Sequence, residues 1–221
     1  MRTAAIIVAA GKSRRFSHKV RKQFANLKGK PVFLWSVEAF SKISAVKQII
    51  LVLPKEDMLK YNNLAKKSGL TIVAGGRERH DSVKAGLKAV KNDIDYVAIH
   101  DGARPLIRKE IIVNALRLAE KHGASVVAVP AKETIKVSVD GIKVNTTIPR
   151  DTVWLAQTPQ VFRLAIINEA YASLRVKFVT DDAQVLELYG KTACIVPGDN
   201  SNIKITEKAD IETAEMLLGQ R

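Results

Sequence analysis

Short apolar runs alternate with helix-like patterns through the first 130 residues, and no other feature of the sequence constrains the fold as strongly. The runs are apolar throughout rather than at every second position, as expected for strands of a parallel sheet covered on both faces. We therefore predict a doubly wound, Rossmann-like α/β fold with three layers and a mostly parallel sheet. The strands are expected at residues 4–10, 47–53, 70–74, 95–99 and 124–129.

Three segments between these strands place apolar residues at positions i, i+4 and i+7, which share one face of a helix. Each such helix can bury that face against the sheet, as a doubly wound fold requires. The three sets are Phe33, Val37 and Phe40; Val83, Leu87 and Val90; and Ile111, Ala115 and Leu118.

The pattern changes after Pro130, where residues 134–148 alternate apolar and polar around Asp140-Gly141. An Asp-Gly pair between alternating runs is typical of a hairpin closed by a two-residue type I′ turn. Because a two-stranded hairpin is marginally stable alone, we expect this protruding arm, at about residues 132–156, to lie against another surface such as a second subunit.

The rest of the chain returns to helical patterns, and we expect residues 1–221 to form a single domain with this arm. Thr180 is expected to cap a helix whose first turn holds two acidic residues, an arrangement that the helix dipole favours. The expected elements are helices at about 160–173 and 181–189, a strand at 192–196 and a last helix near 207–218.

The segment Gly11-Lys12-Ser13-Arg14-Arg15 follows the first expected strand and looks like a loop that binds phosphate. It is not a P-loop, whose first glycine would fall on Ile6. It is not a dinucleotide fingerprint either, since Ser13 and Phe16 stand where glycines are needed. Open α/β sheets nevertheless bind ligands at the carboxyl ends of their strands. We predict a phosphate site there, with solvated charges in a turn as the structural alternative.

The charge balance limits the partners. With 36 basic and 22 acidic residues, the chain carries a net charge of +14, which favours nucleotides, phosphorylated metabolites or nucleic acid. The single Cys194 fits a reducing compartment. The apolar run after Met1-Arg2 is short for a signal peptide, and no run approaches the roughly 18 residues that span a bilayer. We expect a cytoplasmic protein without membrane contact.

The block Ile99-His100-Asp101-Gly102-Ala103-Arg104 is the most specific stretch of the sequence. An acid at the carboxyl end of a strand, beside a nucleotide, can hold Mg²⁺ or a ribose hydroxyl. Arg104 could neutralise Asp101 or reach a phosphate. The structural alternative is an Asp–Arg pair that pins the loop before Pro105.

This block and seven others resemble the signature of the 2-C-methyl-D-erythritol 4-phosphate cytidylyltransferases. The resemblance implies a fold of the nucleotide-diphosphosugar transferase type. It also implies transfer of CMP from CTP to methylerythritol phosphate, which gives 4-diphosphocytidyl-2-C-methyl-D-erythritol and pyrophosphate in isoprenoid biosynthesis. The other blocks are AAGKSRRF, KQF at 22–24, GGRERHDSV at 75–83, ETIK at 133–136, TPQVF at 158–162, TDDA at 180–183 and NIKIT at 202–206.

The resemblance also implies the roles of single residues. Arg15 and Lys22 would hold the CTP phosphates and stabilise the transition state, and Arg150 and Lys204 would position methylerythritol phosphate. Gly76 permits close backbone approach to a planar base, and a serine hydroxyl can reach its edge. The full nucleotide-binding set would be Ala9, Ala10, Gly11, Gly76, Ser82 and Asp101, and Thr134, Thr158 and Arg104 would assist in binding the second substrate.

A metal and a second subunit are further implications of the resemblance. Mg²⁺ or another divalent cation would bind mainly through the CTP phosphates, with Asp101 as the candidate protein ligand. In a homodimer joined through the arm, Thr134 and Arg150 would act on the partner's substrate. Without the resemblance, both would be read as polar residues on an exposed hairpin. The sequence departs from the family pattern at Ser13, Arg21 and Ser201, where a glycine, a proline and an acid are usual.

Two other functions remain open from the sequence. Ribitol-5-phosphate cytidylyltransferases share much of the pattern and the same reaction, and only the pocket for the alcohol phosphate separates them. The charge would also permit a non-catalytic nucleic-acid-binding protein. No nucleic-acid-binding motif is present, however, and aromatic residues are only 5% of the chain. The resemblance implies CTP and methylerythritol phosphate as partners, and we expect no nucleic acid.

Overall fold

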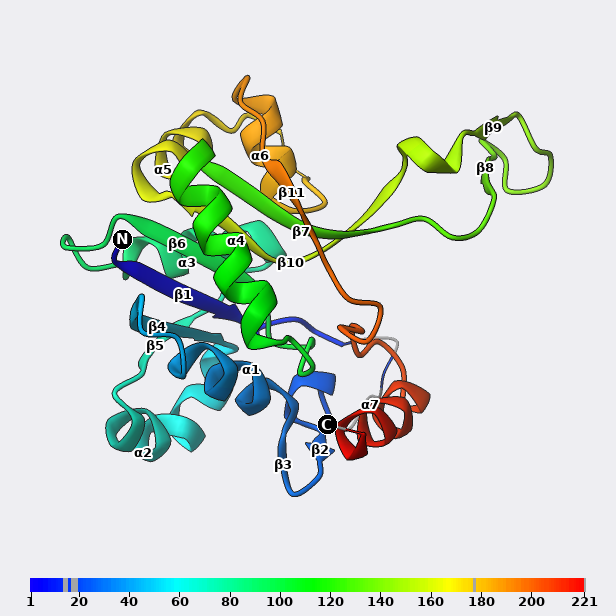
Figure 1. Ribbon diagram of the computed structural model, residues 1–221. Helices are drawn as coiled ribbons and strands as arrows, with labels where there is room; N and C mark the ends of the chain where they lie inside the picture. Colours follow the sequence, from blue (N-terminus) through cyan, green and yellow to red (C-terminus); the bar gives the residue numbers. More distant parts are fainter. Residues whose placement is uncertain (14–15, 17–19, 177, 221) are drawn as a thin grey trace.

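A seven-stranded sheet forms the centre of the computed structural model, which describes residues 1–13, 16, 20–176 and 178–220 (Figure 1). The strand order is β11-β7-β10-β6-β1-β4-β5. Only β10 runs antiparallel to its neighbours, so the predicted mostly parallel sheet is confirmed. The strands are β1 Thr3–Val8, β4 Val46–Leu53, β5 Thr71–Ala74, β6 Tyr96–Asp101, β7 Ala124–Pro130, β10 Trp154–Arg163 and β11 Cys194–Pro197.

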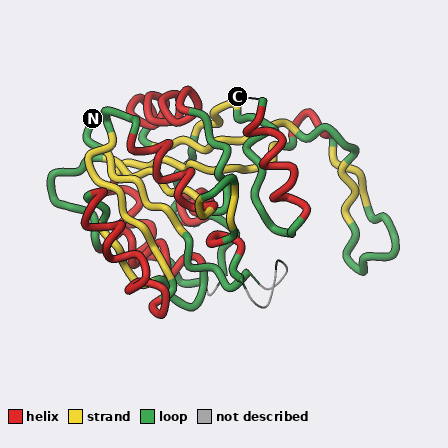
Figure 2. The backbone as a smooth tube through the Cα atoms, turned by 90° about the horizontal axis from the view of Figure 1, so that it is seen from below, coloured by secondary structure: helices red, strands yellow, loops and turns green. Residues whose placement is uncertain are grey.

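Helices cover both faces of this sheet and complete the three predicted layers (Figures 1 and 2). One buried cluster joins α1, α2 and α4 to one face, and a second joins α3, α5 and α6 to the other. A smaller cluster packs α7 against β2 Asn26–Leu27 and the start of α1. None of the helices in the described ranges has the length and apolar character that a bilayer crossing requires. The helices are α1 Val32–Ser41, α2 Met58–Ser68, α3 Arg79–Lys88, α4 Lys109–His122, α5 Leu164–Ser173, α6 Asp182–Leu188 and α7 Ala209–Gly219.

The register of the two central strands brings distant sequence blocks together. Strands β1 and β6 pair in parallel with Val8 opposite Asp101, and the N–H of Gly102 donates to the carbonyl of Val8 at 2.9 Å. The loop after β1 therefore leaves the sheet beside the IHDGAR block. Parallel pairing places these carboxyl ends at one edge, as the sequence predicts for the ligand site.

The five strands predicted in the first 130 residues are confirmed, but residues 154–163 differ from expectation. A helix was expected from about residue 160, whereas β10 continues to Arg163 and α5 begins at Leu164. Proline cannot donate to the ladder, so Pro159 is an unusual residue within a central strand. The structure accommodates it at a register irregularity between Ala156 and Gln160, and pairing with β6 and β7 on both sides fixes the rest of the strand.

The arm projects from the body in both views and is less tightly closed than predicted (Figures 1 and 2). Its strands, β8 Ile135–Val137 and β9 Thr146–Ile148, pair antiparallel and leave residues 138–145 as a loop. The predicted two-residue type I′ turn is therefore wrong. The carboxylate of Asp140 accepts hydrogen bonds from the N–H groups of Ile142 and Lys143, both at 2.9 Å, and these side-chain bonds replace the ladder.

The first turn of α6 also differs from expectation. Asp181 caps this helix, since its Oδ1 accepts a hydrogen bond from the N–H of Gln184 at 2.9 Å. The predicted cap, Thr180, is one residue too early. Its N–H and hydroxyl donate instead to Oε1 of Gln184, at 2.6 and 3.1 Å.

A buried chain of hydrogen bonds ties the end of β6 to β10. The N–H of Asp101 donates to Oγ1 of Thr158, which lies 3.1 Å from Nδ1 of His100. Nε2 of His100 lies 3.1 Å from the carbonyl oxygen of Arg104. Because a carbonyl only accepts, Nε2 carries the proton and Nδ1 accepts from the threonine hydroxyl. Burial lowers the pKa of His100 to about 4, so the imidazole is neutral.

This buried imidazole predicts a pH-dependent stability. Between about pH 4 and pH 6.5 the unfolded chain binds a proton at His100 that the folded chain does not, so stability falls as the pH is lowered. We expect a loss of roughly 3 kcal/mol in unfolding free energy across this window, measured by urea denaturation. His100→Gln should flatten the dependence, and His122→Gln, at an exposed site, should keep it. A wild-type stability that is constant over the window would contradict this account.

Candidate active site

A cavity of about 220 Å³ opens at the carboxyl ends of β1 and β6. Its walls come from the loop after β1, the segment before α3, the end of β6 and the chain that precedes α7. The structure thus brings together eight of the residues predicted from the sequence. They are Ala9, Ala10, Gly11, Lys22, Gly76, Ser82, Asp101 and Lys204.

A second cavity, of about 250 Å³, adjoins the first. Arg79, Asp101 and Lys204 line both, so these three side chains form the wall between them. Arg104 and Thr158, which the sequence predicts for the second substrate, line the second cavity. Two adjoining spaces with a shared charged wall suit a reaction between two bound molecules.

Gln23 holds the loop after β1 in place. Its Nε2 donates to the carbonyls of Ala9 and Gly11, at 2.7 and 2.9 Å, and its Oε1 accepts from the hydroxyl of Ser13 at 2.8 Å. Ser13 has a φ of 54°, a backbone conformation that favours glycine, and its hydroxyl bond supports it there. Gln23 directly follows Lys22, so the same short helix, η1 Lys22–Phe24, carries the predicted cation and the loop's anchor.

Two glycines shape the opposite wall. A Cβ at Gly75 would collide with Ala10, and one at Gly76 would collide with Asp81, so neither position has room for a side chain. The N–H of Gly76 donates to Oγ of Ser82 at 3.1 Å, and that hydroxyl donates to the carbonyl of Glu78 at 3.2 Å. Ser82 therefore braces this turn against the first turn of α3.

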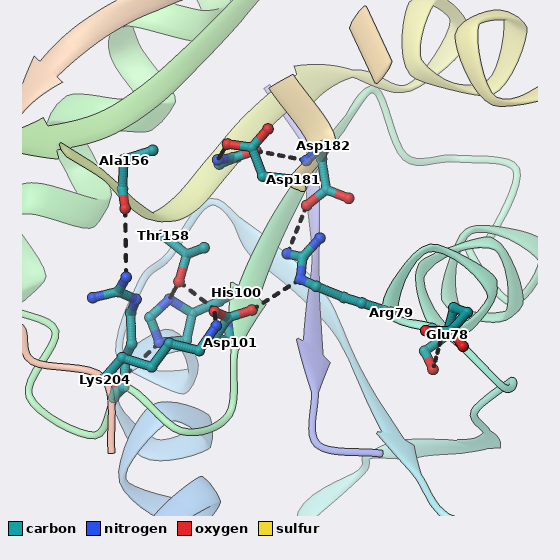
Figure 3. A network of polar contacts seen from close by, with 12 residues as sticks. Glu78, Arg79, His100, Asp101, Ala156, Thr158, Asp181, Asp182 and Lys204 are labelled. Carbon is teal, nitrogen blue, oxygen red and sulfur yellow. Dashed lines mark hydrogen bonds and ion pairs between the residues drawn. The ribbon is translucent and has the colours of Figure 1, made fainter. Parts of the chain in front are cut away.

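Opposite charges meet on the wall that the cavities share (Figure 3). Nζ of Lys204 lies 2.6 Å from Oδ2 of Asp101, and Nε of Arg79 lies 3.2 Å from its Oδ1. Burial alone would raise the pKa of Asp101. Arg79, Lys204 and Arg104 reverse that effect and hold it well below its usual range. The carboxylate is thus ionised, and both of its oxygens have cationic partners.

Arg79 is the main site residue that sequence reasoning missed. It lies in the block GGRERHDSV, from which only a glycine and the serine were singled out. Its partners, Asp101 and Asp182, are 22 and 103 residues away in the sequence, so spacing gave no signal for the contact. Its position at the start of the helix that follows the glycine pair is the sequence feature that could have identified Arg79 as a site residue.

Arg104 makes different contacts from those expected. Its guanidinium donates to the carbonyl of Asn202 at 2.8 Å and approaches that of Ala156 at 3.5 Å. The ion pairs described for Asp101 are with Arg79 and Lys204, and Arg104 acts on that carboxylate only through space. The Asp101–Arg104 ion pair, which the sequence left open as the structural alternative, is not among the described ion pairs, and Arg104 makes these two backbone contacts instead.

Three predicted residues lie apart from the cavities or outside the description. Thr134 and Arg150 are exposed on the arm, where a guanidinium N–H of Arg150 donates to the carbonyl of Lys132 at 3.1 Å. A single chain therefore does not bring them to the body's site. Arg15 lies outside the described residues.

The site contains little that could hold a metal by itself. No cluster of three or more metal-ligating side chains occurs among the residues that the structure describes. In the first cavity the carboxylates are those of Asp101 and Glu78. Such a site suits a cation that arrives with substrate phosphates, since Mg²⁺ commonly takes one or two carboxylates plus phosphate oxygens.

Comparison with known proteins matches this fold and its sequence blocks. The model of the IspD family, 2-C-methyl-D-erythritol 4-phosphate cytidylyltransferase, matches residues 3–220. The enzymes of that name from Endomicrobium trichonymphae and Alkaliphilus oremlandii are 46% and 42% identical over 219 and 229 residues. The alignments cover 99% of each chain in the first case, and 100% of this chain and 96% of the relative in the second.

Solved structures give the same result. The 4-diphosphocytidyl-2C-methyl-D-erythritol synthase from Anaerococcus prevotii superposes with a TM-score of 0.88 at 32% identity, covering 100% of this chain and 96% of that one. The 2-C-methyl-D-erythritol 4-phosphate cytidylyltransferase from Thermus thermophilus superposes with a TM-score of 0.82 at 29% identity, covering 98% of both. The chain therefore belongs to the 2-C-methyl-D-erythritol 4-phosphate cytidylyltransferase family.

Proposed function

We propose that this protein transfers CMP from CTP to 2-C-methyl-D-erythritol 4-phosphate and releases pyrophosphate. The observation that carries the proposal is the full-length family match in a chain whose two adjoining cavities share a cationic wall. The first cavity has the glycine-lined walls that a nucleotide base needs. The second, lined by Arg104 and Thr158, would take the polyol phosphate.

The obstacle to this reaction is the repulsion between two polyanions. Two negative charges about 4 Å apart repel by roughly 4 kcal/mol at an effective dielectric constant of 20. Lys22 on the first cavity and Lys204 on the shared wall supply positive charge against this repulsion. Arg15, which precedes Lys22 by seven residues in the sequence, would add a further cation.

The chemistry needs no nucleophilic side chain. An ionised phosphate oxygen of methylerythritol phosphate attacks the α-phosphorus of CTP, and pyrophosphate leaves with the electrons of the broken P–O bond. No general base is required because the attacking oxygen carries no proton. Charge builds on the α-phosphate oxygens as the pentacoordinate transition state forms, and Lys22 and Arg15 stabilise it there.

Mg²⁺, bound mainly through the CTP phosphates, fits the donors of the first cavity. Asp101 would be its protein ligand, and the ion would neutralise phosphate charge. The carboxylate of Asp101 is already ionised, so it needs no deprotonation to accept a cation. On binding the cation, Asp101 would weaken its ion pair with Arg79 or with Lys204.

A homodimer completes the proposed site. The arm exposes apolar side chains that a partner could cover, namely Val139, Ile142, Trp154 and Leu155. Exposed arms of this kind are typical of interaction surfaces. Thr134 and Arg150, distant from their own cavities, would then act on the substrate bound by the partner.

Substitution of the phosphate-binding cations tests the proposed mechanism. Lys22→Ala and Arg15→Ala should each lower kcat by about 10²–10³, the scale for one preorganised electrostatic donor. The measurement is the steady-state release of pyrophosphate. Lys42→Ala, which removes an exposed lysine after α1, is the matched control and should be unchanged. The assignment fails if Lys22→Ala and Arg15→Ala both keep near-native kcat.

The acceptor is tested by pyrophosphate release from CTP and Mg²⁺ with each of two polyol phosphates. We expect methylerythritol phosphate to give the higher kcat/KM and ribitol 5-phosphate to be a poor acceptor. The reverse order would retain cytidylyl transfer but overturn the proposed substrate. Salt-dependent binding of DNA or RNA without pyrophosphate release would instead favour the nucleic-acid-binding alternative.

Mixing two impaired variants tests the shared site. Lys22→Ala and Arg150→Ala should each have strongly reduced activity, but a hybrid dimer of the two contains one site with both residues intact. Activity should therefore rise on mixing, after subunit exchange, and sedimentation should show a dimer. A fully active monomer, or no restored activity in a mixture shown to contain hybrid dimers, would contradict the shared site.

A further inference from the structure

Two carboxylates hold one guanidinium on the wall between the cavities (Figure 3). Nη2 of Arg79 lies 2.8 Å from Oδ2 of Asp182, and its Nε lies 3.2 Å from Oδ1 of Asp101. The two acids differ in their surroundings. Asp101 lines both cavities, whereas the side chain of Asp182 is fully buried behind them. Asp182 thus holds Arg79 from the buried side, and Asp101 contacts it from the side of the cavities.

The position of Asp182 is itself fixed by buried hydrogen bonds. The hydroxyl of Tyr171 donates to its Oδ1 at 2.6 Å. Its backbone N–H and that of Ala183 donate to Oε1 of Gln160, at 3.1 and 2.9 Å, and Nε2 of Gln160 donates to Asp181 at 2.8 Å. The carboxylate therefore has a defined place at the start of α6, independent of any ligand in the cavities.

We propose that Asp182 is a positioning residue for Arg79. It keeps the Arg79 guanidinium on the shared wall, where Arg79 contacts substrate phosphate, while Asp101 binds a ligand. The inference rests on the proposed cytidylyl transfer. A substrate that engages Asp101 weakens one of the two ion pairs of Arg79. With Asp182 absent, the guanidinium would be left as a partly buried charge without either of its carboxylate partners, an arrangement that costs free energy.

The charges of the network support this role. Burial alone would lower the pKa of Arg79, but Asp182 and Asp101 raise it well above its ordinary value. Burial and the adjacent Asp182 carboxylate raise the pKa of Tyr171, so its hydroxyl stays protonated and donates. Arg79 is thus a permanent cation with a permanent anchor, in contrast to Lys204, whose described ion pair is with Asp101.

The alternative is that the network only links α6 to α3 and stabilises the fold. Loss of such a link would lower the stability, whereas a positioning role predicts that the effects of Asp182 and Arg79 substitutions on kcat are coupled. We would measure kcat, KM for each substrate and thermal unfolding for Asp182→Asn, Arg79→Gln and the double variant. Ser125→Ala, which removes a buried 2.7 Å hydrogen bond to Ala115 far from the cavities, is the control for a loss of stability alone.

Asp182→Asn should lower kcat by up to about 100-fold, the scale for a misplacement of about 1 Å. Arg79→Gln should lose at least as much, and the double variant should be no slower than Arg79→Gln, because Asp182 acts through Arg79. Tyr171→Phe, which keeps the shape of the core, should lower kcat in the same direction by less. If Asp182→Asn fails to fold, Tyr171→Phe serves as the test variant. Ser125→Ala should keep wild-type kcat.

Two results would overturn the inference while leaving cytidylyl transfer intact. One is wild-type kcat in folded Asp182→Asn, or in Tyr171→Phe where Asp182→Asn does not fold. The other is a double variant whose loss is the product of the two single losses. Wild-type protein that releases no pyrophosphate from CTP with either polyol phosphate would instead overturn the proposed function and this inference with it.

Discussion

The balance of charge around Asp101 is the constraint on which the rest of the site depends. Two phosphorylated substrates can approach each other only where fixed cations offset their repulsion, yet cations gathered without a substrate repel one another. Asp101 offsets this repulsion by pairing with Arg79 and Lys204. The same carboxylate can then exchange these partners for a cation or hydroxyl that arrives with the nucleotide.

The fold places these charges by simple means. Parallel pairing of β1 and β6 brings the loop after β1 beside the end of the IHDGAR block. Gln23 then fixes that loop, and the glycine pair before α3 leaves room opposite it. The central strands from which these segments leave are buried and closely packed, which defines where the loop and the turn begin.

The sequence predicted the elements whose signals are local. Continuous apolar runs identified five parallel strands, and short motifs identified Asp101 and Lys204. Contacts between distant segments were not predictable in this way, which is why the role of Gln23 in holding the loop and the ion pairs of Arg79 were missed. The prediction for the arm loop was wrong for a related reason. Asp-Gly predicts a tight turn, but the carboxylate of Asp140 bonds to the backbone and holds the loop open.

A crystal structure of the protein with CTP tests the central claim most directly. The account predicts that the triphosphate lies within hydrogen-bonding distance of the Lys22 ammonium and the Arg15 guanidinium, with the base against the Gly75-Gly76 turn. A triphosphate bound away from both cations would contradict the proposed role of the cationic site.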